Sequence, residues 1–401
     1  MIDSGAVFTG LLLCFSGAAL ALHCLSCLLA AAQCRRQGGK PAATAGAAEE
    51  GISFLCPVGS GQSLAALERS LRSVFAVSYR RKEIIICLDA AGQDDTAKTA
   101  LIRAVRQDYA ETASLLVTGA GAAGGEQGSL AKGWKAARYD RVMMLAPGIV
   151  LPPDCPARFL SLWQAGQHKA AGRPTGLVSA VLWGVGAQNG PARLEAAFLN
   201  SWQAQRLLLA GSLGRGVGQS SAQLWHYDIM SSGGGIKAFT RQAGEHAMAA
   251  AATQLVCRQG KKICLSARPL PWDLSPAAAP AFYDKRPAAR CRLVAALLAR
   301  QVQRLRFYRR FLPQFFYAES VLAVFLPFLV LAGACFGGAA PVWLLAAFLA
   351  LWYGAEAGLI LCLGRAAADK ARQGGWQQAI MLLLRDIIFP FLWLFSLIKA
   401  L

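Results

Sequence analysis

Chemistry in an α/β domain is expected just beyond the carboxyl ends of its strands. The apolar run Val142 to Leu145 ends at Ala146-Pro147-Gly148 and resumes as Ile-Val-Leu-Pro-Pro-Asp. The tip of this strand is therefore a natural ligand position. Neither Ala146 nor Gly148 has a side chain that can bind a metal ion or move a proton, so we expect no metal ligands there.

A second apolar run does end in acids. Glu83 to Asp89 reads as a buried strand with an acid at its end, and Asp94 and Asp95 follow shortly after it. Two interpretations carry equal weight. The acids can bind a ligand at the strand end, or they can be a strand-end acid and the N-cap of the next helix.

Alternating strand and helix patterns surround these two runs, which predicts an α/β fold with a parallel sheet and helices on its faces. The Gly-rich stretch Ser231 to Arg241 is expected to lead into another strand. The predicted strands are Ile52 to Val58, Glu83 to Asp89, Ser114 to Thr118, Val142 to Leu145, Leu177 to Gly184 and Lys261 to Ser266, and the predicted helices are Ser63 to Phe75, Asp94 to Asp108, Ser129 to Ala137, Ala192 to Leu209 and Thr240 to Gln259.

Composition places this domain in a membrane protein. The 401 residues are 55% hydrophobic and 16% charged, whereas soluble domains carry about 25% charged residues. The net charge of +19 comes from Arg and Lys residues that flank apolar runs. This pattern favours a membrane surface over nucleic acid as the partner of the basic charge.

The amino-terminal segment reads as a membrane anchor. Ala6 to Ala32 is almost continuously apolar, long enough to cross a hydrocarbon core of about 30 Å. Arg35, Arg36 and Lys40 follow it, which is the reverse of the charge order in a cleaved signal peptide. The positive-inside rule puts the basic end in the cytoplasm.

Three further apolar segments predict a multi-pass protein of a bacterial inner membrane with a cytosolic main domain. They are Ser320 to Phe336, Val342 to Leu363 and Gln378 to Lys399. A re-entrant course stays open for the last, because Arg385 and Asp386 lie inside it. The expected organisation is an anchor and linker at 1–50, the cytosolic domain at 51–290, a basic amphipathic helix at 291–317 and a membrane bundle at 318–401.

The complete layout resembles the family-2 and family-21 membrane glycosyltransferases, in particular ceramide glucosyltransferase and the bacterial hopanoid-biosynthesis glycosyltransferases. These have one anchor, a cytosolic glycosyltransferase-A-type domain and a carboxyl-terminal membrane bundle. The matching stretches beyond the strands above are Arg193 to Asn200, Gly235 to Arg241, Gln303 to Phe307 in place of a Gln-x-x-Arg-Trp motif, and Leu384 to Trp393 in place of Leu-Arg-Asp-Leu-Leu-x-Pro-x-x-Trp.

The resemblance implies transfer of a sugar, with inversion, from a nucleotide sugar such as a UDP-sugar to a membrane lipid of ceramide or hopanoid type. It implies no cofactor with certainty. The substrate-binding candidates under it are Asp89, Asp94, Asp95, Lys132, Gly235 and Arg304, and the catalytic candidates are Asp228, Glu245, Gln303 and Arg306.

Two departures from the family pattern put catalysis in doubt. Ala146 and Gly148 replace the Asp-x-Asp metal motif, so a divalent cation is doubtful. Met248 and Ala249 replace the Glu-Asp pair that supplies the general base. Glu245 is then the nearest substitute, although with His246 it is more typical of a surface pair, and Asp228 is another.

A non-catalytic interpretation therefore stays open beside the enzymatic one. The chain would then bind lipid or nucleotide sugar, or act as a scaffold for a partner protein. The loop Gly233 to Gly235 and the Gln303 motif favour the enzyme, whereas the missing acids favour the pseudoenzyme. In an enzyme without metal ligands, diphosphate charge would fall to cations, and the candidates are Lys132, Lys237, Arg304 and Arg306.

Overall fold

A seven-stranded sheet forms the centre of the fold in the computed structural model, with strand order β3-β2-β1-β4-β6-β5-β7. The described residues are 4–37, 50–59, 62–89, 95–118, 125–167, 172–219, 222–232, 235–236, 245–311, 340–366 and 375–398. The strands are β1 (Ile52–Val58), β2 (Lys82–Leu88), β3 (Ser114–Thr118), β4 (Arg141–Leu145), β5 (Thr175–Val185), β6 (Ala222–His226) and β7 (Lys262–Asp273).

Strand direction sets where a ligand can bind. Strands β1 to β4 are parallel to one another, and β5 is parallel to β7. Strand β6 is antiparallel to both β4 and β5, so β5 and β7 share the direction of β4. Every strand except β6 therefore ends at the same edge of the sheet.

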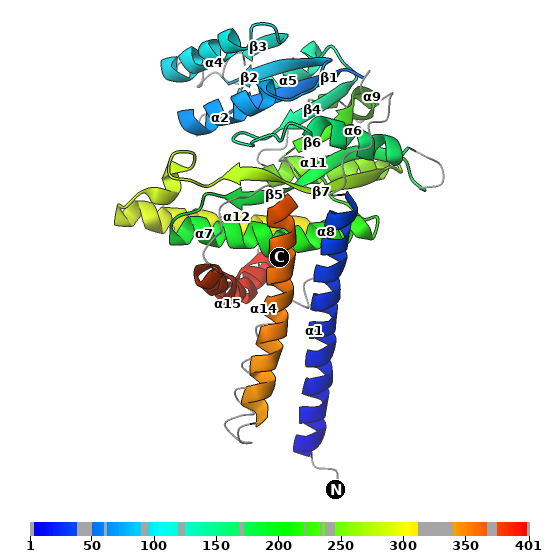
Figure 1. The fold of residues 1–401 in the computed structure, drawn as a ribbon, viewed down its shortest axis with the longest axis vertical. Coiled ribbons are helices and arrows are strands. Elements are labelled where there is room, and N and C mark those ends of the chain that lie inside the picture. Colours follow the sequence, from blue (N-terminus) through cyan, green and yellow to red (C-terminus); the bar gives the residue numbers. More distant parts are fainter. Residues whose placement is uncertain are drawn as a thin grey trace.

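Helices cover both faces of the sheet and extend away from it (Figure 1). The helices are α1 (Ser4–Gln37), α2 (Leu64–Phe75), α4 (Thr96–Asp108), α5 (Gly125–Ala136), α6 (Cys155–Ala165), α7 (Gly190–Ala197), α8 (Ala204–Ser212), α9 (Tyr227–Ser232), α11 (Glu245–Arg258), α12 (Pro287–Phe311), α14 (Ala340–Ala366) and α15 (Gly375–Ile398), with a π-helical turn η2 at Phe198–Gln203 and a 3-10 turn η3 at Pro280–Tyr283. Helices α7, α8 and α12 lie across the base of the domain.

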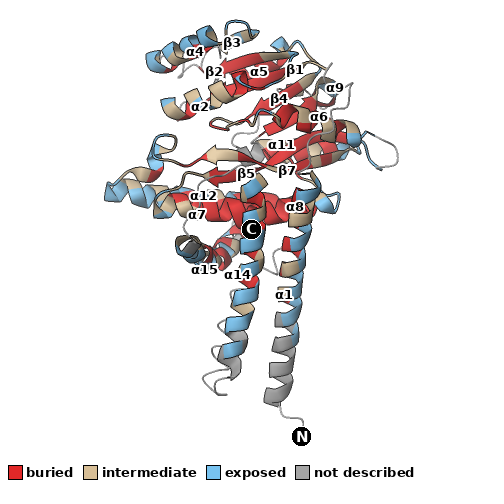
Figure 2. Ribbon diagram, in the orientation of Figure 1, coloured by how far each residue is buried: buried red, intermediate tan, exposed pale blue. Residues whose placement is uncertain are grey.

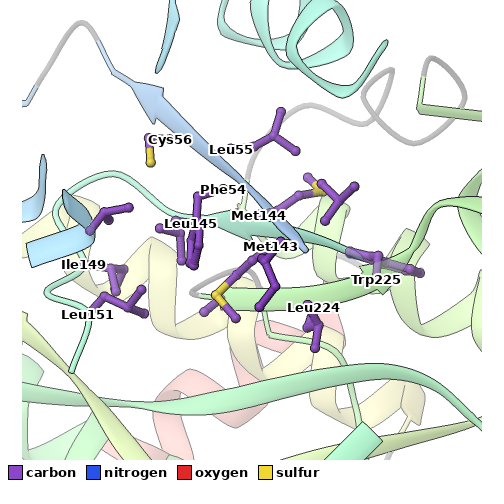
Figure 3. Packing of buried hydrophobic residues seen from close by; sticks show 14 of the residues in the cluster. Phe54, Leu55, Cys56, Met143, Met144, Leu145, Ile149, Leu151, Leu224 and Trp225 are labelled. Atoms are coloured by element: carbon purple, nitrogen blue, oxygen red, sulfur yellow. The ribbon is translucent and has the colours of Figure 1, made fainter. Parts of the chain in front are cut away.

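Helices and strands form where the apolar periodicity of the sequence and its capping residues indicate the same element. All seven residues of β1 are buried, as a strand covered on both faces requires. Helix α2 begins after Ser63, whose side chain accepts a hydrogen bond from the Ala66 N–H, and it buries Leu67, Leu71 and Val74. The core they enter is built around β1, β4 and β6, where Phe54, Met143, Leu224 and Trp225 lie together (Figure 3).

The prediction of a wholly parallel sheet is wrong at β6. Its sequence Ala-Gln-Leu-Trp-His is short and carries a polar residue inside, so its pattern is weak. Gln223 is buried, and its side-chain oxygen accepts from Trp225 Nε1 at 2.9 Å, whereas its Nε2 has no hydrogen-bond partner among the described residues. The strand expected after the Gly-rich loop is not found at 235–236, which are helical, and the rest of that loop lies outside the described residues.

Three helices in the described part of the chain are long and apolar enough to cross a membrane, with spans at Gly17–Gln37, Ala346–Ala366 and Trp376–Ser396. The predicted segment Ser320 to Phe336 lies outside the described residues. Helices α1 and α14 pack along each other and reach the domain with their carboxyl ends, and many of their described side chains below the domain are exposed (Figures 1 and 2). These helices associate the protein with a membrane.

Helix α15 takes another direction. Figure 1 shows it nearly end-on, lying across the direction of α1 and α14, and it packs against α7 and α12. Its buried side chains include Leu382, Phe389 and Leu392. Its exposed apolar side chains are Trp376, Ile380, Leu383, Leu384, Ile387, Phe391, Leu394 and Phe395. The helix therefore has one face on the domain and one uncovered apolar face.

The charged residues predicted inside this apolar segment are paired. Arg385 Nη2 lies 2.9 Å from Glu356 on α14 and 2.6 Å from Asp386, and Arg385 also donates to Ser201 of η2. Tyr353 donates to Asp386 at 3.0 Å. Glu356 thereby joins α14 to α15.

Close packing of α5 on the sheet gives a first stability prediction. A methyl group on Gly133 would lie 2.5 Å from Cys87 Sγ and 2.8 Å from Leu55 Cδ2. We expect Gly133→Ala to lower the free energy of unfolding by about 1–3 kcal/mol through overpacking. Thermal unfolding in detergent checks this. Gly190→Ala, where a methyl group meets nothing within 4 Å, is the control and should stay close to the parent.

Candidate active site

The carboxyl ends of β1, β2 and β4 form one edge. Val58 pairs with Leu88, and Leu55 pairs with Met144, so these three neighbouring strands end together. The residues that follow them are Gly59, Asp89 and Ala146. This is the position that the sequence indicated for a ligand.

Asp89 directly follows β2 and is buried, with 7% of its surface exposed. A carboxylate held at a strand end next to two other strand ends can accept hydrogen bonds from a ligand lying across the edge. Of the two described acids, Asp89 is buried, whereas the Asp95 side chain is 38% exposed. Asp94 lies outside the described residues.

Asp95 has the capping role that was one of its two interpretations. Its Oδ1 accepts from the Lys98 backbone N–H at 3.1 Å, and helix α4 starts at the next residue. This hydrogen bond lowers the pKa of Asp95, so the group is a carboxylate at neutral pH. A ligand role for Asp95 stays a proposal.

Lys98 joins α4 to the end of β1. Its Nζ lies 3.5 Å from Asp95 Oδ2 and donates to the Gly59 carbonyl at 3.3 Å, and the residue is 4% exposed. A buried cation at this edge was not predicted from the sequence. The available signal was the acid–lysine spacing of three residues at a helix start.

Backbone contacts hold the loop after β4 in place. Gly148 has φ +79°, in the left-handed region. Ile149 then bridges to Trp272, Val150 N–H donates to the Pro271 carbonyl at 3.2 Å, and Ser70 donates to the Ile149 carbonyl at 2.8 Å. The loop is therefore fixed between α2 and β7.

These residues do not fit the divalent cation that the Asp-x-Asp pattern holds. A methyl group at Ala146 and a hydrogen at Gly148 offer no oxygen ligand. In the part of the chain that the structure describes, no group of three or more His, Cys, Asp or Glu side chains could hold a metal ion. We derive no step through a metal at this edge.

The loop backbone allows a direct test of this disagreement. Restoring an acid with Gly148→Asp forces an L residue into the left-handed region, and we expect a loss of about 1 kcal/mol of folding free energy. Thermal unfolding measures it. Gly59→Ala at the same edge is the control, since its methyl group would meet Pro147 at an ordinary 3.6 Å. Full stability together with Mn²⁺-dependent nucleotide binding in Gly148→Asp would show that the loop can still hold a metal.

Helix α12 presents different residues from those predicted. Gln303 is exposed, whereas Gln301 is buried and donates to Glu195 Oε2 at 2.7 Å. Arg304 Nη1 lies 2.8 Å from Glu195 Oε1, with both side chains almost fully buried. Arg304 thereby joins α12 to α7, and we do not propose it as a substrate ligand.

Arg306 of α12 has unmet hydrogen-bonding capacity. It is half-buried, and its Nε and Nη2 atoms are buried without a hydrogen-bond partner among the described residues. Buried guanidinium N–H groups are normally paired, and phosphate oxygens are strong acceptors for them. Arg306 therefore stays a candidate for an anionic group.

Asp228 lies at the wrong edge for the role considered for it. Because β6 is antiparallel, its carboxyl end lies beside the start of β4, and the Tyr227 N–H donates to the Asp140 carbonyl there at 2.8 Å. The Asp228 side chain is 84% exposed. A general base has to reach the proton that it removes, so we do not propose Asp228 as the general base.

The amino-terminal end of α11 lies toward the opposite edge of the sheet from Asp228. This helix ends at Arg258, shortly before β7 begins at Lys262, so its amino-terminal end lies toward the carboxyl edge of the sheet. Glu245 is its first residue, and its side chain is outside the described set. Ala249 is buried and Met248 packs against the core, which leaves the family's base position apolar.

The remaining two candidates are Lys132 and Gly235. Lys132 is exposed on α5, a helix that packs on β1 to β3. Gly235 has φ +73° at a described pair of residues in the Gly-rich loop, and Lys237 lies outside them. Lys132 and Gly235 therefore stay candidates for substrate binding.

Residues 14–400 match the sequence pattern of glycosyl transferase family 21. The chain belongs to this family. Membership confirms the family predicted from the sequence and, with the observed sheet, the glycosyltransferase-A-type fold class. No curated protein is significantly similar to this family 21 chain.

Solved glycosyltransferases are similar only at a distance. Staphylococcus aureus TarS 1–349 has 9% sequence identity and a TM-score of 0.39 over 85% of this chain and 91% of its own. Its complex with UDP-GlcNAc has 10% identity and a TM-score of 0.38 over 81% and 92%. Glucosyl-3-phosphoglycerate synthase from Mycobacterium tuberculosis, with Mn²⁺, UDP and phosphoglyceric acid, has 14% identity and a TM-score of 0.32 over 64% and 80%.

Proposed function

We propose that this family 21 protein transfers a sugar from a UDP-sugar to a membrane lipid of ceramide or hopanoid type, with inversion and without a metal ion at the tip of β4. The observation that carries the proposal is the buried carboxylate of Asp89 at the edge where β1, β2 and β4 end together. A carboxylate at such an edge can accept hydrogen bonds from a ligand that lies across the strand ends.

The donor would lie across this edge. Asp89 accepts hydrogen bonds from the nucleoside, and Asp95 and Lys98 fix the end of β1 against α4 beneath it. Arg306 supplies N–H groups to the diphosphate from α12, together with Lys132 from α5. Cationic groups of this kind neutralise the charge that develops on the leaving diphosphate.

The chemical step would then be a single displacement. The lipid hydroxyl oxygen attacks the anomeric carbon, the bond from that carbon to the diphosphate oxygen breaks, and UDP leaves. Glu245 takes the hydroxyl proton as general base. Attack opposite the leaving group inverts the anomeric centre. The lipid acceptor would enter from the membrane in which α1 and α14 lie. The main domain would be on the cytosolic side of a bacterial inner membrane, an orientation that the basic residues Arg35, Arg36 and Arg365 favour.

One set of observations favours a second function, a non-catalytic subunit that binds lipid or nucleotide sugar for a partner protein. Ala146 and Gly148 leave the β4 tip without ligands, and Met248 and Ala249 pack where the family has its base. Losing both sets of acids removes the family's usual route to catalysis. The two functions differ in turnover and not in the fold.

Calorimetric titration of the detergent-purified protein with UDP and UDP-sugars, with and without Mn²⁺, tests the proposal. We expect binding that Mn²⁺ does not change. Radiolabelled sugar transfer to lipid then follows, with Glu245→Gln expected to abolish turnover while leaving UDP affinity intact. Binding without any turnover supports the non-catalytic function, and failure to bind any nucleotide overturns the donor site at Asp89.

A further inference from the structure

A second basic site lies far from the strand ends, where the two long helices meet the domain. It is a cavity of about 210 Å³ lined by Cys34 of α1, Arg158 of α6, Arg268 of β7, and Arg365 and Ala366 of α14. Three of its five lining residues are arginines. None of them belongs to the proposed donor site.

Two of these arginines hold the helix ends in place. Arg158 Nη1 donates at 2.8 Å to the carbonyl of Gln37, which is the last residue of α1. Arg268 Nε donates at 3.0 Å to the carbonyl of Ala366, which is the last residue of α14. Both also bind Asp154, Arg158 at 2.7 Å and Arg268 by a shorter contact. The site is therefore built from four separate elements and is not a chance group of surface side chains.

The cavity keeps an excess of positive charge after this pairing. Three guanidinium groups line the cavity, and among the described residues the carboxylate of Asp154 pairs with two of them, Arg158 and Arg268, so these four side chains carry a net charge of about +2 at neutral pH. Arg158 is 9% exposed, and its Nε is buried without a hydrogen-bond partner among the described residues. A buried guanidinium N–H left unpaired in this setting calls for an anionic acceptor.

Depth in the membrane indicates what that acceptor is. The apolar spans end at Gln37 and Ala366, so the cavity lies at the level where lipid phosphates meet water. Basic pockets between membrane helices at this level suit phospholipid headgroups, and planar guanidinium groups match phosphate oxygens in pairs.

We propose that this cavity binds the phosphate of an anionic phospholipid, held by Arg158, Arg268 and Arg365 at the ends of α1 and α14. The site is independent of sugar transfer. It would be occupied equally in an active enzyme and in a non-catalytic subunit, because none of its residues touches the strand-end edge.

The test counts lipids on the full-length protein by native mass spectrometry in detergent, titrating phosphatidylglycerol or phosphatidylcholine at roughly 0.3 M salt, where surface charges are screened. We expect one phosphatidylglycerol to bind in preference to phosphatidylcholine. Arg365 is exposed and can be changed without disturbing the core. Arg365→Gln should weaken that binding about five- to tenfold.

The matched control is Arg36→Gln, an exposed arginine at the end of α1 that does not line the cavity. It should change the affinity by less than twofold. An equal loss in Arg36→Gln, or equal binding of phosphatidylcholine, would overturn the proposal in favour of general surface charge. Displacement of the lipid by millimolar glycerol 3-phosphate would overturn it in favour of a soluble phosphate ligand.

Discussion

Replacing Glu195 with alanine is expected to lower the free energy of unfolding by about 3–5 kcal/mol. Glu195 is 1% exposed, forms an ion pair with Arg304 at 2.8 Å and accepts a hydrogen bond from Gln301 at 2.7 Å. Its removal leaves the Arg304 guanidinium buried without its counter-charge, a cost far above that of lost packing. The measurement is thermal or denaturant unfolding of the detergent-solubilised protein.

Two controls separate the ion pair from other causes. The double variant Glu195→Met with Arg304→Met removes both charges and should recover most of the loss, since buried pairs are often replaceable by apolar residues. Glu68→Ala removes a carboxylate from the exposed pair with Arg72 and should cost about 1 kcal/mol or less. A Glu195→Ala protein as stable as the Glu68→Ala protein would contradict the role given to this contact.

Replacing Asp89 with asparagine is expected to weaken UDP binding about 10- to 100-fold, because a charge-assisted hydrogen bond to the nucleoside is worth about 1.5–3 kcal/mol. The amide has nearly the size of the carboxylate, so the strand end should keep its packing. The same loss is expected with and without Mn²⁺. Calorimetric titration with UDP measures it.

Asp108→Asn is the matched control for this change. Asp108 is an exposed acid at the end of α4, in an ion pair with Arg72, and it lies at the opposite end of that helix from Asp95. Its replacement should leave UDP affinity unchanged. Unaltered UDP affinity in Asp89→Asn would remove the nucleoside from the edge formed by β1, β2 and β4.

Much of the sheet was predictable because its strands are apolar throughout. Ile52 to Val58 and Ser114 to Thr118 coincide with β1 and β3, and the predicted helix Ser63 to Phe75 matches α2 with its cap. Strand β6 was missed because a buried Gln223 breaks its pattern, and Trp225, the donor to the glutamine oxygen, is known as its partner only from the fold.

The candidate site was predictable in position but not in every residue. Strand order brings Asp89 to the edge, as expected. Asp228 was misplaced because the direction of β6 decides which edge it follows, and a sequence does not carry that direction. On α12, Gln301 and Gln303 are two residues apart and point to different sides of one helix, so a basic amphipathic pattern leaves open which of them is buried.

Helix α15 has a mechanical consequence for this protein. A stem of two parallel helices, α1 and α14, would by itself let the domain tilt over the membrane. With α15 lying across that stem, one face on α7 and α12 and the other lined by apolar side chains such as Ile387 and Phe391, we expect it to rest in the lipid plane. The stem and α15 then support the domain along two directions, which fixes the distance between the domain and the bilayer. The strand ends therefore cannot move toward the membrane, and a lipid headgroup has to leave the bilayer surface to reach them.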